Sequence, residues 1–265
     1  DAYWSPFFVA FAAAITYAPK LDTSIILLNG IVLAFFAFLI TYFEVVKNKE
    51  FKLDEFRGYP LSFESLYVPF ILAILVLVTN YIYPNIKVIV LISTFSIFIT
   101  LLIFPFKKGL SQSLIKFNNH VIEELPKMKV EIALFLVAGM FGISISSILI
   151  GLNLDLPFKI FDWQIASILL FIFIILAFIG IHPIITIAII GDFLGGVNHT
   201  LLAITFLMAW STTVSTSPFS GLNLTIVARY NFDAKEIFRL NIFYAFKMYL
   251  ICVFCLFILS KYLGL

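Results

Sequence analysis

The sequence predicts an all-α polytopic membrane protein, and two features of its composition support this. Of its 265 residues, 62% are hydrophobic and 12% are charged, against about 45–50% and about 25% in a typical soluble domain. The apolar residues form blocks of about 20, the length that crosses roughly 30 Å of hydrocarbon. This excludes a soluble enzyme, a disordered chain, a disulfide-stapled secreted domain and an outer-membrane barrel with alternating strands. The net charge of +2 gives no reason to expect a nucleic-acid partner.

Hydropathy divides the chain into three kinds of apolar segment. The first stretch, 4–18, is too short to span a membrane alone. Full-length spans are expected at 23–43, 65–83, 86–106, 131–151 and 240–262. Two longer stretches, 163–194 and 197–228, each contain a proline near the middle. No methionine or signal-like n-region precedes the first segment, so we expect the chain to be the C-terminal part of a longer protein.

Lysine and arginine predict the orientation. They concentrate in three loops, 44–64, 107–130 and 229–239, which the positive-inside rule assigns to the cytoplasm. An even number of crossings must separate the second loop from the third, but three apolar stretches lie between them. One stretch must therefore enter and leave the membrane on the same side. We expect this to be 163–194, as a re-entrant hairpin folded at Gly180-Ile181-His182-Pro183. The stretch 197–228 then crosses as one broken helix.

The loop 107–130 has its own helical pattern. Six apolar residues recur at spacings of three and four, namely Leu110, Leu114, Phe117, Val121, Leu125 and Met128. Such spacing places them on one helical face. We interpret the loop as a helix along the cytoplasmic membrane interface, with a soluble amphipathic loop as the alternative.

The richest concentration of polar groups lies where 197–228 is broken. Seven of the ten residues from 211 to 220 carry hydroxyls, Pro218 cannot donate to a helix, and Gly221 permits backbone geometry closed to other residues. Freed carbonyls would suit a sodium ion, and the next helix N-terminus would attract an anion. A kink whose hydroxyls satisfy the carbonyls is the alternative. The candidate residues are Ser215, Thr216, Ser217, Pro218, Ser220, Gly221 and Asn223.

A second break resembles the first. Ser5-Pro6-Phe7 matches Ser217-Pro218-Phe219, and each tripeptide leads into a short apolar helix and then a full span. Paired proline-interrupted segments in two halves of a chain are typical of a transporter's binding site near the bilayer midplane. We therefore add Ser5 and Pro6 to the candidate site, and expect both breaks to meet the tip at Gly180 and Pro183.

Two further polar features lie inside apolar stretches. A histidine within a membrane costs free energy unless it has a polar partner or is hydrated, so His182 is a candidate for substrate binding or ion coupling. The alternative is a neutral histidine that is hydrogen-bonded to a carbonyl freed by Pro183. We interpret Asp192 as an interfacial helix-end carboxylate rather than a cation ligand. Cys252 and Cys255 are interpreted as buried structural thiols, and no metal site or catalytic residue is expected.

This layout resembles the C-terminal portion of the ion transporter superfamily, which includes divalent anion:sodium symporters and arsenite permeases. The residues that carry the likeness are 217–229 and 233–238. The resemblance implies two inverted repeats, with 1–43 ending the first, 44–64 as a basic loop and 65–265 forming the second. It also implies a moving part (1–18, 163–194 and 197–228) and a dimerising scaffold that includes 65–106. The family's hairpin tip commonly carries Ser and Asn before Pro, whereas here Gly180, Ile181 and His182 precede Pro183.

The function implied is secondary active transport of a small anion, an organic acid or an inorganic oxyanion, by an elevator-type alternating-access mechanism. Na⁺ or H⁺ would be the coupling ion, without a further cofactor or enzyme activity. The missing Ser and Asn weaken the expectation of sodium and make a proton route through His182 plausible. The alternatives are a sodium/proton antiporter of the same superfamily and a non-transporting structural subunit. The expected partners are the anionic substrate, the lipid bilayer and a second copy in a homodimer, in a bacterial inner membrane.

Overall fold

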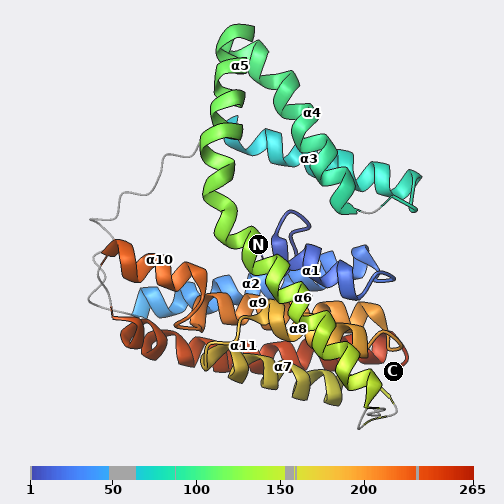
Figure 1. Ribbon diagram of the computed structural model, residues 1–265. Coiled ribbons are helices and arrows are strands. Elements are labelled where there is room, and N and C mark those ends of the chain that lie inside the picture. Colours follow the sequence, from blue (N-terminus) through green and yellow to red (C-terminus); the bar gives the residue numbers. More distant parts are fainter. Residues whose placement is uncertain (1, 48–63, 87, 153–157, 159, 231–232) are drawn as a thin grey trace. The chain divides into compact units, whose positions relative to one another are not determined.

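A computed structural model describes residues 2–47, 64–86, 88–152, 158, 160–230 and 233–265. The described residues form helices joined by turns, with no strand among them, as the sequence predicts (Figure 1). The chain divides into two compact units, the first comprising Asp1–Phe51 and Phe135–Leu265 and the second Lys52–Leu134. The predicted loop 44–64 lies almost entirely outside the described residues.

The first unit holds most of the helices. Its N-terminal part contains α1 (Val9–Tyr17) and α2 (Thr23–Lys47). Its larger part contains most of α6 (Lys129–Gly151), then α7 (Trp163–Phe178), α8 (Pro183–Phe193), α9 (His199–Thr216), α10 (Gly221–Tyr230) and α11 (Ala234–Tyr262).

Helix α9 forms the centre of the first unit. It packs against α1, α2, α7, α8, α10 and α11, and every residue from 200 to 213 is buried. A helix that is apolar on all sides is stable only when other elements surround it. Asn198 begins the helix by accepting hydrogen bonds from the N–H groups of Thr200 and Leu201. The α9 sequence has no polar face at helical spacing of the kind that marks a surface helix, so its core position follows from its composition.

The second unit contains α3 (Glu64–Ile82), α4 (Val88–Lys108) and α5 (Leu110–Asn119). Helix α3 packs against α4, and α4 against α5. Helical structure is thus present where the sequence predicts an interfacial helix, but it changes type beyond α5: His120–Glu124 is a π-helix and Leu125–Met128 a 3₁₀-helix. Pro126 explains part of this change, because it has no N–H to continue an α-helical ladder. Leu110, Leu114 and Phe117 remain exposed, as expected for an apolar face that meets a membrane.

Within the part of the chain that the structure describes, four helical segments are long and apolar enough to cross a membrane: Thr23–Glu44, Val88–Lys107, His199–Leu224 and Lys235–Tyr262. Three shorter apolar helices are Tyr67–Ile82, Gly139–Gly151 and Trp163–Phe178. In α2, α4 and α11 many large apolar side chains are exposed, among them Phe38, Phe98 and Phe254. Such exposure is unfavourable in water and normal against lipid. These features agree with an integral membrane protein.

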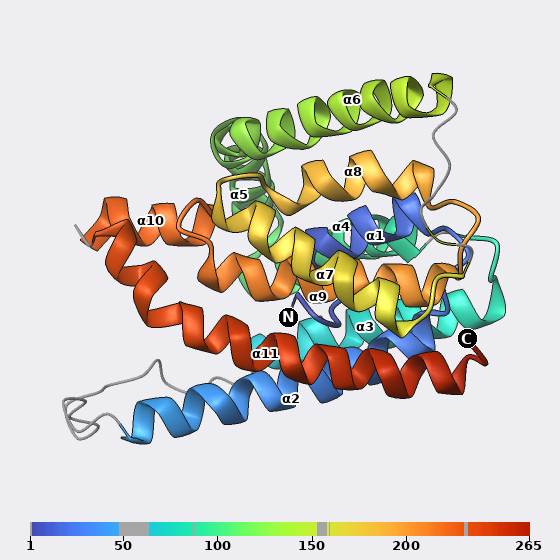
Figure 2. The same ribbon diagram turned by 90° about the horizontal axis from the view of Figure 1, so that it is seen from below.

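The stretch 163–194 forms two helices, α7 and α8, joined by a turn at 179–182. The stretch 197–228 is likewise divided into α9 and α10 at 217–220. Figure 2 shows the turn between α7 and α8 beside the junction of α9 and α10. The two interruptions that the sequence predicts are therefore present, and they lie next to each other.

Candidate functional site

The turn that ends α7 is built around Gly180. Gly180 has a φ of 103°, a conformation that costs other residues roughly 1–2 kcal/mol. Its N–H donates to the Ala177 carbonyl (3.2 Å) and the Ile181 N–H donates to the Leu176 carbonyl (2.9 Å). This pair of bonds is the Schellman motif, in which glycine closes the C-terminus of a helix. Gly180 thereby ends α7 and reverses the chain.

His182 then begins α8. Its ring Nδ1 accepts a hydrogen bond from the Ile184 N–H (3.2 Å), and its carbonyl accepts from the Ile185 N–H (2.9 Å). Pro183 follows at the first helical position, where its missing N–H costs nothing. His182 is therefore the N-cap of α8, and it bonds to an N–H rather than to a freed carbonyl. Because Nδ1 accepts, the ring must carry its proton on Nε2. The ring also meets Trp210 edge-on, with centroids 5.2 Å apart.

The second break begins at Ser217, where the backbone becomes extended (φ −68°, ψ 127°). The Ser217 hydroxyl accepts the Phe219 N–H (3.3 Å), and its carbonyl accepts the Ser220 N–H (3.1 Å). Pro218 occupies the turn between them. Ser220 in turn begins α10, because its hydroxyl accepts the Asn223 N–H (3.1 Å). The Ser-Pro-Phe-Ser sequence thus ends one helix and starts the next.

Ser217 connects the two interruptions. Its hydroxyl donates to the Ala177 carbonyl at 2.6 Å, across 40 residues of sequence, and its side chain is buried. The Phe219 ring covers Gly180 closely enough that an added Cβ there would lie 3.4 Å from the ring. The hairpin tip is therefore held on the break by one buried hydrogen bond and one ring contact.

A small cavity lies at this contact. Among the predicted residues, Gly180, His182, Pro183, Ser217 and Ser220 line it, together with Ala177, Ile181, Thr213, Val214 and Phe219. Its volume is about 10 Å³, close to the minimum that holds one water molecule. A dicarboxylate needs a site of a few hundred Å³. In this conformation the cavity is closed to any such anion.

Backbone charges around the cavity are mixed. Helices α8 and α10 begin there and α7 and α9 end there. Helix N-termini carry partial positive charge and C-termini partial negative charge. Two of the N-terminal N–H groups, those of Ile184 and Asn223, are already bound by His182 and Ser220. An anion would have to displace these side-chain caps to use the same N–H groups.

Two of the carbonyls freed by the break, those of Ser215 and Ser217, are also occupied. The amide of Asn223 donates to the carbonyls of Ser215 (3.1 Å) and Ser217 (2.8 Å). Asn241 of α11 donates to the same Ser215 carbonyl (3.0 Å). A carbonyl oxygen has two lone pairs, so Ser215 offers none for a cation. Asn223 is 2% exposed, and its predicted place at the break is explained by this bonding.

Two hydroxyls near the break bond within α9. Thr216 Oγ1 donates to the Thr212 carbonyl (2.6 Å) and Ser215 Oγ donates to the same oxygen (3.3 Å). This is the pattern expected of a satisfied helix kink. Gly221 does not adopt the special backbone conformation expected of it, because the positive φ angles among the described glycines belong to Gly109, Gly180 and Gly264. Gly221 simply begins α10, where a Cβ would meet nothing within 4 Å.

The N-terminal break has the same local geometry as the second. The Ser5 hydroxyl accepts the Phe7 N–H (3.3 Å) and the Ser5 carbonyl accepts the Phe8 N–H (3.1 Å). Helix α1 begins three residues after Pro6, as α10 begins three residues after Pro218. The helices that follow, α2 and α11, each begin with an aspartate cap, Asp22 and Asp233 respectively.

Ser5 and Pro6 lie outside the described lining of the cavity. The N-terminal segment instead reaches α9 just ahead of the second break, where the Tyr3 and Thr212 hydroxyls share a hydrogen bond of 3.2 Å. The N-terminal segment therefore contacts the last turns of α9, just ahead of the second break. The hairpin tip contacts the second break itself. Sequence reasoning did not identify Ala177, Trp210 or Asn241, because helical spacing gives no signal for partners 26 to 40 residues apart.

Three remaining expectations concern other groups. Cys252 and Cys255 are buried free thiols, in agreement with a structural role. The Asp192 side chain lies outside what the structure describes. Within the described residues, no group of three or more His, Cys, Asp and Glu side chains is placed to hold a metal ion.

Searches against protein-family models, curated proteins and solved structures found no match to this chain.

Proposed function

We propose that the protein is a secondary active transporter of a small anion, an organic acid or an inorganic oxyanion, driven by a cation gradient. The observation that carries the proposal is the repeated break. Ser5-Pro6-Phe7 and Ser217-Pro218-Phe219 form the same turn with the same two hydrogen bonds. Each turn opens a short helix that precedes a long, aspartate-capped one. Paired proline-interrupted segments in corresponding positions are the arrangement from which many secondary transporters build a midplane site.

The hairpin of α7 and α8 supports the same proposal. Its tip is irregular backbone inside apolar surroundings, which a membrane tolerates only against protein or a wet cavity. Here the tip is covered by the second break through Ser217 and Phe219. In the proposed mechanism α7 and α8 form a re-entrant hairpin, and its tip must separate from the break to admit the substrate. The cavity of about 10 Å³ is then the state that is too small to hold the substrate.

The helix ends suggest what would bind after that opening. The N-termini of α8 and α10 attract an anion, and the C-termini of α7 and α9 attract a cation. A site at which helix N-termini and helix C-termini meet favours symport, in which an anion and a cation move together. The family resemblance adds four further parts to this proposal. They are an inverted-repeat relation between the halves, an elevator motion, a homodimer and a bacterial inner membrane.

The test is uptake by the longest available form of the protein in proteoliposomes. Labelled succinate, malate, citrate, phosphate and sulfate are offered under an imposed sodium gradient, an imposed proton gradient, or neither. Uptake of at least one anion that rises with either gradient supports the proposal. His182→Ala removes the α8 cap, and we expect it to slow uptake with either gradient.

Other results identify the alternatives. Cation-dependent proton movement without anion uptake would favour a sodium/proton antiporter. The absence of both fluxes across the panel would contradict this proposal and favour the structural subunit.

A further inference from the structure

A groove lies between two helices of the second unit. Helix α4 ends at Lys108 and α5 begins at Leu110, and the two helices diverge from this corner (Figure 1). Gly109 forms the corner with a φ of 78°. Its carbonyl accepts the N–H (3.1 Å) and the hydroxyl (2.8 Å) of Ser113 in the first turn of α5. The cavity between the helices has a volume of about 700 Å³, within the range of about 300–1,000 Å³ that is typical of ligand sites.

The α4 wall of this groove is apolar. Ile97, Leu101 and Phe104 line it. The hydroxyls of Ser96 and Thr100 also lie on this wall, but each donates to a carbonyl one turn earlier in α4. The wall therefore offers mainly hydrocarbon to a ligand. It belongs to a segment that is long and apolar enough to cross a membrane, so a lipid chain is its natural partner.

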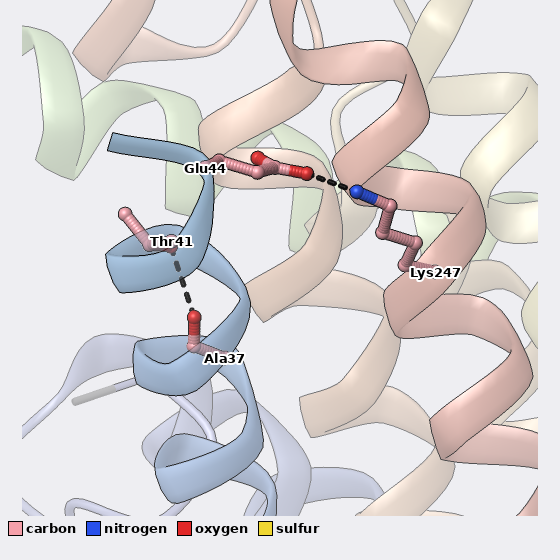
Figure 3. Close-up of polar contacts among 4 residues, drawn as sticks. All are labelled: Ala37, Thr41, Glu44 and Lys247. Carbon is pink, nitrogen blue, oxygen red and sulfur yellow. Dashed lines mark hydrogen bonds and ion pairs between the residues drawn. The ribbon is translucent and has the colours of Figure 1, made fainter. Parts of the chain in front are cut away.

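The opposite wall combines apolar residues with polar and charged ones. Four exposed polar residues follow one another along α5 and the π-helix, namely Lys116, Asn119, His120 and Glu123. Within the part of the chain that the structure describes, no side-chain hydrogen bond or ion pair engages any of these four residues. In the first unit, by contrast, the opposite charges of Glu44 and Lys247 form an ion pair with each other (Figure 3).

The spacing of the two charges in the groove prevents them from forming a similar pair. Lys116 and Glu123 are seven residues apart, which in a helix is about 10 Å along the axis. Helical ion pairs form between residues three or four apart, so each of these charges is left to a ligand. His120 and Glu123 lie in the π-helix, and π-helical turns are rare and occur frequently at functional sites.

We propose that this groove binds a phospholipid whose headgroup carries both a phosphate and a primary ammonium group, as phosphatidylethanolamine does. Lys116 donates to the phosphate oxygens, and Glu123 accepts from the ammonium N–H groups. Asn119 and His120 lie between them and add hydrogen-bonding groups for either part of the headgroup. One acyl chain lies along the α4 wall and continues into the bilayer. This site does not depend on the proposed transport function.

Charge complementarity selects this headgroup among common phospholipids. An anionic phosphatidylglycerol headgroup satisfies Lys116 but leaves Glu123 without a partner. Phosphatidylcholine matches both charges, but its trimethylammonium group has no N–H to donate to Glu123. A nearby cation that would favour an anionic lipid is directed elsewhere, because the Lys107 ammonium lies over the Tyr67 ring of α3, 5.2 Å from its centroid.

The predicted topology agrees with a headgroup at this place. The positive-inside rule assigns 107–130 to the cytoplasmic side of the membrane. An amphipathic helix there lies at the depth of the lipid headgroups, and pockets beside basic residues on this side of a membrane bind them.

The experiment counts bound lipids by native mass spectrometry. The longest available form of the protein is delipidated in detergent and titrated with phosphatidylethanolamine, phosphatidylcholine or phosphatidylglycerol of identical acyl chains. We expect phosphatidylethanolamine to bind with a Kd about tenfold lower than the other two, the smallest effect of a hydrogen bond to a charged group. Glu123→Gln should remove most of this preference. Lys116→Gln should weaken the binding of all three lipids, because each carries a phosphate.

Matched controls lie on α4 and α11. Leu101 and Leu102 are 47% and 46% exposed, and of the two only Leu101 is part of the described lining of the groove. Leu101→Trp should fill the groove and weaken the binding of all three lipids, whereas Leu102→Trp should bind them as the wild type does. Lys235→Gln and Glu236→Gln remove exposed charges at the start of α11 and should have no effect.

Each other outcome would overturn a defined part of the proposal. Equal affinity of the wild type for the three lipids, or tightest binding of phosphatidylglycerol, would overturn the headgroup assignment, and neither result needs a variant that folds. Full preference in Glu123→Gln would show that this carboxylate does not bind the ammonium group. Undiminished lipid binding in Leu101→Trp would place the lipid outside the groove. Conversion of a dimer to a monomer in that variant, with lipid retained, would assign the groove to a second copy of the chain.

Discussion

Replacing Ser217 with alanine tests whether one hydrogen bond holds the hairpin tip on the second break. The Ser217 hydroxyl donates to the Ala177 carbonyl at 2.6 Å and is buried. Ala177 keeps the Gly180 N–H as a donor, so the loss is one bond rather than an unpaired carbonyl. Such a bond contributes about 0.5–1.5 kcal/mol. If opening of the tip breaks it, the open population rises about two- to twelve-fold.

Hydrogen–deuterium exchange measures this opening directly. In lipid nanodiscs, exchange of the peptide that contains Gly180 and Ile181 should accelerate by that factor in Ser217→Ala. Ser5→Ala is the matched control, because Ser5 makes the same turn and its described bonds stay within that turn. Ser5→Ala should leave exchange at the tip unchanged. Equal rates in the wild type and Ser217→Ala would refute the conclusion that this bond keeps the tip closed.

Three further predictions concern stability, each measured by thermal unfolding in one detergent. Gly180→Ala should lower the free energy of unfolding by about 1–2 kcal/mol because of its positive φ, whereas Gly221→Ala should be neutral or stabilising; equal effects would contradict the assigned turn. Gly142→Ala should destabilise by about 1–3 kcal/mol, because a Cβ there overlaps Ala188 of α8, while Gly139→Ala on the same helix meets open space and should not destabilise. Asn223→Ala should cost about 1–3 kcal/mol, because it removes two buried hydrogen bonds, to the Ser215 and Ser217 carbonyls, and each contributes about 0.5–1.5 kcal/mol. Asn241→Ala should cost less, since it removes one such bond; the reverse order would show that the break is held from α11.

Local sequence signals predicted much of the fold. Blocks of apolar residues predicted the positions of the long helices. The stretch from Gly180 to Pro183, which contains two helix-breaking residues, predicted the turn between α7 and α8. The match between Ser5-Pro6-Phe7 and Ser217-Pro218-Phe219 predicted a shared structure, and both tripeptides do form the same turn. These features depend on a few neighbouring residues, which is why the sequence alone reveals them.

The partners within the site depend instead on how distant helices dock. Ser217 meets Ala177 across 40 residues, Asn241 meets Ser215 across 26, and Lys247 meets Glu44 across 203. No periodic pattern encodes such pairs. The same limit explains Gly221, whose expected special backbone belongs to Gly180 instead. It also explains the break, where the freed carbonyls suggested ion ligands but the amides of Asn223 and Asn241 bind the Ser215 and Ser217 carbonyls.

The most direct measurement of the central claim is anion uptake by the wild type, Ser217→Leu and Ser5→Ala under one set of ion gradients. Leucine at 217 removes the bond to Ala177 and fills the cavity of about 10 Å³ beneath the tip. The transporter proposal predicts saturable uptake by the wild type and Ser5→Ala, and loss of uptake in a folded Ser217→Leu protein. Undiminished uptake in Ser217→Leu would contradict a substrate site between the hairpin tip and the second break.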